Sequence, residues 1–170
     1  MMLTLDDIRG YIGSLGIVDD RNAYIGKLNS KKDHSIGVYH RQGSGPPVMA
    51  LGGHDYSSYD VRRISLLVHW DKDVQASERA AYALYEKLKN VSSLSIGDTP
   101  INCIILQVPE PVDVGTDDKG VYEYVIWLEF VYQRVRYKRW QMQQREKCIP
   151  CITMCLSLAL RALRVQLNRW

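Results

Sequence analysis

The alternation of apolar and polar residues between Tyr59 and Trp70 is the first strongly regular pattern of the chain. Ile64, Leu66 and Val68 occupy every second position there. A period of two is typical of a strand whose side chains point alternately to a core and away from it. This segment is therefore predicted to be a strand with one core face.

A second and more regular alternation covers residues 121–136. One face would carry Tyr122, Tyr124, Ile126, Leu128, Phe130 and Tyr132. The other would carry Val121, Glu123, Val125, Trp127, Glu129 and Val131. We interpret the first face as core. The second mixes charge with large apolar groups, as a surface that meets a partner does. Val125, Trp127, Glu129 and Val131 are therefore the candidate subunit-interface residues.

Two segments have helical spacing instead. Thr4 can cap a helix over residues 5–15, whose acidic first turn suits the positive end of the helix dipole. Asp73 can cap a second helix over residues 74–90. Its apolar stripe is rich in alanine, so this helix can lie close against a sheet.

The rest of the chain predicts short strands joined by turns. Residues 36–39 and 101–108 are expected to be strands, whereas residues 92–100 are expected to form a polar connection. The glycines within residues 42–47 do not suit a phosphate loop, because no Gly-Lys-Ser/Thr follows them. The order of elements predicts an α+β fold: a mostly antiparallel sheet with two helices packed on one face.

The composition changes abruptly near residue 139, so we expect an α+β domain at 1–139 and a C-terminal extension at 140–170. Leu156, Leu160, Leu163 and Leu167 would share one face of a helix in that extension. Such a helix could bind a partner or a membrane surface. A translation shifted out of the natural frame, or an extension peculiar to this chain, would look the same. The apolar run at 148–160 is short for a transmembrane helix.

Charge and composition narrow the function further. The chain has 170 residues and a net charge of +3, which is below the basic balance of a dedicated nucleic-acid binder. The stretch 134–139 is basic and precedes Trp140, so it could contact phosphates and bases, or it could be a solvated strand end. The acidic start of the chain does not resemble an export signal, and the thiols are expected to be reduced.

Neither a metal nor a cofactor is predicted. Cys148, Cys151 and Cys155 lie together, but a zinc site needs a fourth ligand, and Cys103 belongs to a separate strand. His34, His40, His54 and His69 are scattered, and we expect them to be ordinary surface residues. No nucleophile motif is present, so the chain is not predicted to be an enzyme, although folding could assemble a catalytic set.

Four segments together carry a resemblance to a known family. Residues 55–60 lead into the first strand, and residues 76–88 hold the pattern Ala-x-x-Leu-Tyr-x-x-Leu. Residues 110–120 contain Glu-Pro followed by Gly-x-Asp and Gly, just before the long strand at 122–132. In this order, residues 4–136 resemble the minor capsid and tail-terminator (head–tail joining) proteins of tailed phages and prophages of Gram-positive bacteria.

The resemblance implies a structural virion protein rather than an enzyme. Such a protein forms a ring with itself, typically a homohexamer, at the head-proximal end of the tail. There it ends tail-tube growth and joins the tail to the head. Its partners would be the tail tube protein and a head-completion or connector protein, with passive contact to DNA in the channel and no membrane. It would be made in the cytoplasm of the bacterial host. The alternatives are a nucleic-acid-binding module that uses residues 134–139, or an enzyme whose site is not visible in the sequence.

Overall fold

Strand β7 (Tyr122–Gln133) is the centre of the sheet. The computed structural model describes residues 2–26, 33–43, 49–53, 56–91 and 93–134. On one side β7 pairs with β3 (Tyr59–His69) through eleven consecutive residue pairs without a register shift. On the other side it pairs with β5 (Thr99–Leu106) and β6 (Val112–Thr116), which lie beside different halves of β7. The two strands that the sequence predicts most clearly are therefore neighbours.

Three shorter strands complete the sheet. The order is β1-β2-β3-β7-β5-β4, with β6 paired to β7 outside this path. Strand β1 (Ala23–Ile25) runs parallel to β2 (Ser35–His40), whereas the other described pairs are antiparallel. Strand β4 (Leu94–Ile96) forms the far edge beside β5. The mostly antiparallel sheet is confirmed.

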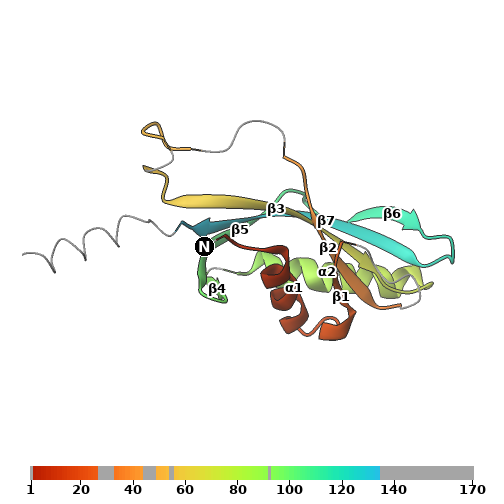
Figure 1. The fold of residues 1–170 in the computed structure, drawn as a ribbon. Helices are drawn as coiled ribbons and strands as arrows, with labels where there is room; N and C mark the ends of the chain where they lie inside the picture. The colour runs from red at the N-terminus through yellow and green to blue at the C-terminus, as the bar shows by residue number, and fades with distance from the viewer. Residues whose placement is uncertain (1, 27–32, 44–48, 54–55, 92, 135–170) are drawn as a thin grey trace, which may run out of the picture. The chain divides into compact units, whose positions relative to one another are not determined.

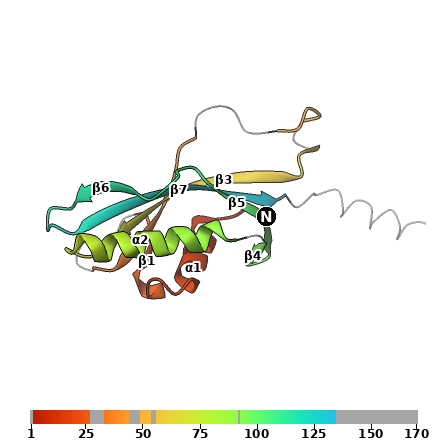
Figure 2. The same cartoon turned by 180° about the vertical axis from the view of Figure 1, so that it is seen from behind.

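Both described α-helices lie on the same face of this sheet (Figure 1, Figure 2). Helix α1 (Leu5–Ser14) begins with a capping box in which the Thr4 hydroxyl and the Asp7 carboxylate satisfy each other's backbone N–H groups. Helix α2 (Val74–Lys89) begins after Asp73, whose side chain accepts the N–H of Gln75. Each predicted helix ends within one residue of the observed one, and the α+β class with both helices on one side is confirmed.

The core lies between this sheet face and the helices. Alternate residues of β3 and β7 are fully buried, namely Ile64, Leu66, Val68, Ile126, Leu128 and Phe130. They meet Ile8 and Ile12 of α1 and the Ala81, Leu84 and Leu88 stripe of α2. Tyr11 adds an edge-to-face contact with Phe130 at 6.3 Å between ring centroids. The period-two prediction therefore identifies the core face correctly.

The shortest strands are not predicted from the sequence. The polar connection expected at residues 92–100 is wrong, because this segment contains β4 and the start of β5. Gly97 has a φ of +56° in the turn between them, a conformation that glycine adopts without strain. Strands of three residues show too little alternation to be recognised, and β6 is exposed at all five positions, so no apolar face marks it.

The predicted C-terminal helix, the residue 139/140 boundary and three of the four cysteines lie outside the described residues. The unit described above extends to Arg134. In the described ranges, no helix has both the length and the hydropathy to cross a membrane.

Removing a side chain from the centre of the core should lower the stability of the fold. Phe130 is fully buried, so Phe130→Ala is expected to lower the free energy of unfolding by about 3–5 kcal/mol. Val114→Ala on exposed β6 is the control and should change it by less than about 0.5 kcal/mol. Urea unfolding followed by circular dichroism measures both, and similar losses would contradict the location of the core.

A chain that ends after Trp140 should keep a cooperative thermal transition, because the last core strand ends at Gln133. Differential scanning calorimetry of the truncated and full chains tests this. Loss of the transition would show that residues beyond 140 belong to the core.

Candidate subunit interface

The face of the sheet turned away from the helices, here called the outer face, holds the predicted interface residues. The register of β3 and β7 sets Val131 opposite Val61, Trp127 opposite Ser65, and Val125 opposite Leu67. Both helices lie on the other side (Figure 1, Figure 2). No helix of the described chain therefore covers Trp127.

An accessible apolar area surrounds Trp127. Its side chain is 37% exposed although it stands in the central strand, while Val125 and Val131 are half-buried. The area continues sideways to Ile105, which pairs with Glu129, and to Val112, which pairs with Val125. These two neighbours are also exposed. A partner could bury this surface without any rearrangement of the sheet.

Glu129 is paired within its own subunit. Its Oε1 atom lies 2.8 Å from Nε of Arg63, directly opposite on β3. The two side chains are 16% and 30% exposed, so the pair is partly shielded from water. Such an ion pair contributes on the order of 1 kcal/mol to the stability of the fold and fixes the position of both side chains. Glu129 therefore belongs to the outer face as one half of an ion pair rather than as a lone charge.

Arg41 is an outer-face residue that no sequence pattern singles out. Its backbone N–H donates to the carbonyl of Arg63 at 3.2 Å, and its guanidinium lies 4.6 Å from the centre of the Trp127 ring. Gly43, two residues further on, lies against the Arg63 side chain, because a Cβ at this position would come within 2.0 Å of Nη1 of Arg63. The segment after β2 therefore packs on the outer face. No local motif signals this contact, because Arg41 and Trp127 are far apart in sequence.

His69 is buried, and the expectation that the histidines are surface residues is wrong for it. It is 2% exposed at the end of β3, and its Nε2 atom lies 3.2 Å from Oδ2 of Asp117. Oδ1 of Asp117 accepts the N–H groups of Lys119 and Val121, each at 2.9 Å. The pair thus fastens the turn between β6 and β7 to the end of β3.

The same contacts set the ionisation of the carboxylates. The N–H of Val121 lowers the pKa of Asp117 most, and the hydrogen bonds of His69 and Lys119 lower it further. Burial raises the pKa of Glu123, which lies opposite His69 in the register. Among the described residues, no three His, Cys, Asp or Glu side chains are placed to hold a metal. The hydrogen bonds of Asp117 to His69, Lys119 and Val121 hold the turn in place, and we call them the Asp117 clamp.

The remaining candidate residues do not come together. His34 stacks on Trp70 at 4.7 Å between ring centroids, and His40 is exposed at the end of β2. Cys103 is exposed on β5, opposite Val131. Of the basic stretch 134–139 the structure describes only Arg134, whose Nε atom lies 3.7 Å from Asp60. His54, Cys148, Cys151 and Cys155 lie outside the described residues.

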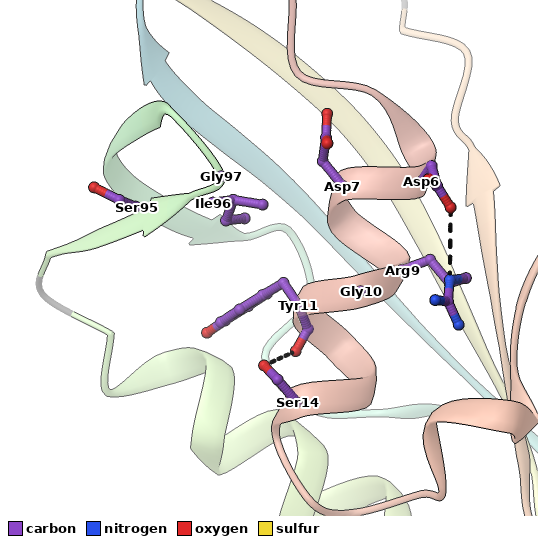
Figure 3. Close-up of a pocket in the computed structure, with 9 residues that line it drawn as sticks. All are labelled: Asp6, Asp7, Arg9, Gly10, Tyr11, Ser14, Ser95, Ile96 and Gly97. Atoms are coloured by element: carbon purple, nitrogen blue, oxygen red, sulfur yellow. Dashed lines mark hydrogen bonds and ion pairs between the residues drawn. The ribbon is translucent and has the colours of Figure 1, made fainter.

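A hollow of about 400 Å³ lies between α1 and the β4–β5 turn (Figure 3). Asp6, Asp7, Arg9 and Tyr11 contribute to its lining, together with Ser14. Asp7 is held by the capping box, and the Ser14 hydroxyl donates to the carbonyl of Tyr11 at 2.7 Å. These lining residues do not pair a nucleophile with a general base. The hollow is an acidic concavity on the helix side of the subunit.

A sheet with helices on one side and accessible apolar residues on the other is typical of a protein with a protein-contact surface. The sequence model of the bacteriophage tail terminator protein family matches residues 11–134, and the chain belongs to this family. No curated protein matches the chain. The predicted relationship to tail terminators is thus confirmed, and the chain is a structural phage tail protein and a virion component.

The Asp117 clamp predicts a specific pH dependence. Because folding lowers its pKa, the charged carboxylate stabilises the fold at neutral pH, and this stabilisation is lost as the pH falls through the folded-state pKa. Asp117→Asn should therefore lower the free energy of unfolding by about 1 kcal/mol at pH 7, and by less at pH 3. Urea unfolding at both pH values measures the difference. Asp118→Asn in the same turn is the control, and an equal loss at pH 3 would contradict the electrostatic origin.

Proposed function

We propose that the chain forms a closed ring of identical subunits at the head-proximal end of the phage tail. The ring ends the growth of the tail tube and joins the tail to the head. Membership of the tail terminator family supports this role. The observation that carries the proposal is the accessible apolar area around Trp127 on a sheet face that no described helix covers.

Ring formation requires a head-to-tail contact between two different patches of each subunit. The outer face, with Val125, Trp127, Glu129 and Val131, supplies one of them. Trp127 already stands in a rigid central strand, so little side-chain ordering opposes its burial. Covering its exposed part contributes on the order of 2 kcal/mol per contact. By resemblance to related tail proteins, the ring is a homohexamer.

The edge strands β1 and β6 are less suited to this contact than the outer face. At β1, the guanidinium of Arg9 donates to the carbonyls of Asp20 and Ala23. Strand β6 follows Pro111, carries Asp113 and has a bulge between Asp113 and Gly115. Proline, charge and bulges are the features that keep edge strands from pairing with another chain. Subunits are therefore expected to meet through side chains of the outer face.

The partners follow from the position of the ring. One rim contacts the tail tube protein and the other contacts a head-completion or connector protein, while DNA passes through the channel with passive contact. The role requires neither catalysis nor a cofactor. The protein is made in the cytoplasm of the bacterial host and functions in the virion at the head–tail junction.

Trp127→Glu tests the outer face as an interface. The change removes the apolar centre of the contact and its interaction with Arg41, and it places a charge that would have to lose water in the ring, so the ring should dissociate while the subunit stays folded. The matched control is Val74→Glu, because Val74 is 41% exposed on the helix side and a carboxylate suits the start of α2. Light scattering gives the assembly state, and circular dichroism gives the fold.

The expected result is a folded Trp127→Glu monomer that fails to complement tail assembly, beside a Val74→Glu variant that assembles normally. An unchanged Trp127→Glu oligomer, or equal loss of assembly in both variants, would count against the outer face as the contact surface.

A further inference from the structure

The Arg41–Trp127 pair is a cation held in place without a carboxylate partner in the described part of the chain. The ion pairs of arginine there join Arg63 to Glu129, Arg134 to Asp60, and Arg9 to Asp6 and Asp20, but none includes Arg41. The indole ring of Trp127 covers one face of the Arg41 guanidinium. The N–H groups of the guanidinium point outward in its plane, where they can donate two parallel hydrogen bonds to a carboxylate. Tryptophan and arginine at the centre of a contact are the residues that most often dominate binding.

We propose that Arg41 on the outer face of one subunit binds Asp6 of helix α1 on the next copy of the chain. This inference rests on the proposed ring, and it names the second of the two patches that a head-to-tail contact needs. Trp127 supplies the apolar centre of the contact, and the Arg41–Asp6 pair sets its orientation.

Charge complementarity selects the α1 surface over the α2 surface. Four exposed carboxylates stand on α1 and on the η1 turn (Asp20–Asn22) with its cap, namely Asp6, Asp7, Asp19 and Asp20, beside the exposed Arg21 and the partly buried Arg9. Helix α2 with its cap has as many exposed acids as bases: Asp73, Glu78, Glu86, Arg79, Lys87 and Lys89. A cation on the outer face is therefore attracted more strongly by the α1 surface than by the α2 surface.

Within the α1 surface, Asp6 is the carboxylate with the most freedom. Asp7 is engaged by Thr4, Asp19 accepts the N–H of Arg21 at 2.9 Å, and Asp20 lies 3.2 Å from Arg9. Asp6 is 80% exposed, and its contact with Arg9 is long, at 3.6 Å. Figure 3 shows Asp6 on the first turn of α1, with its carboxylate pointing toward Arg9 on the side of the helix away from the β4–β5 turn. A partner can thus approach this exposed carboxylate directly.

Arg41 and Asp6 of the same subunit cannot form an ion pair with each other. Arg41 lies on Trp127 on the outer face, whereas α1 lies on the opposite side of the sheet in both views (Figure 1, Figure 2). The sheet and the core lie between Arg41 and Asp6, so the two side chains can pair only between different copies of the chain. That separation is the requirement for a head-to-tail contact.

A charge-reversal cycle in the full chain tests the pair. Arg41→Glu and Asp6→Arg each place like charges opposite each other, and each should raise the dissociation constant of the contact by about tenfold or more. Every subunit of the double variant carries both changes, so each contact regains an opposite pair and the dissociation constant should return to within about threefold of the original. Sedimentation velocity over a concentration series measures all three.

Two sets of control variants separate a specific pair from a general effect of surface charge. Arg79→Glu on α2 and Asp118→Arg in the β6–β7 turn reverse exposed charges outside both patches, and they should assemble normally. Arg41→Gln and Asp6→Asn remove the charge without reversing it and should weaken assembly less than the reversals do. Circular dichroism checks that each variant is folded.

Recovery of the ring in the double variant supports the pair. Failure to recover, with every variant folded, overturns it. If Trp127→Glu dissociates the ring while both charge reversals leave it intact, the Arg41–Asp6 pair is overturned and the outer-face ring survives. If the original chain stays monomeric and Trp127→Glu assembles tails normally, the proposed outer-face ring and the pair both fail.

Discussion

The uninterrupted pairing of β3 with β7 is the interaction on which the rest of the structure depends. Because the register has no bulge over its full length, every alternate residue of both strands points to the same side. Ile64, Ile126 and Phe130 are buried beneath the helices for this reason. A slip by one residue would exchange this core for the charged outer face. The hydrophobic contrast between the two faces therefore specifies the register.

The one-sided covering of this sheet is the feature on which the proposed ring rests. An antiparallel sheet can leave one face accessible, provided that polar and apolar groups share it. Here the Arg63–Glu129 pair supplies charge next to Trp127, so the face is compatible with water. In the proposed ring, the subunit folds first and a second copy then covers this face.

Two long-range contacts shape the surroundings of the outer face. Arg41 brings the segment after β2 onto Trp127, and His69 fastens the β6–β7 turn through Asp117. Each joins a strand end to a loop that would otherwise be held by its backbone alone. They fix the rim of the outer face, so in the proposed ring subunits would meet with little loss of conformational entropy.

The sequence by itself determined the two helices, the strands β3 and β7, their core faces and the relationship to tail terminators. The elements and their core faces follow from caps such as Thr4 and Asp73 and from periodic patterns over many residues, which are local signals. The relationship rests on the resemblance of four segments in their order along the chain. Only the tertiary structure decided the pairing partners of β7, the three-residue strands, the burial of His69 and the position of Arg41. Those depend on contacts between distant residues, and no local pattern records such contacts.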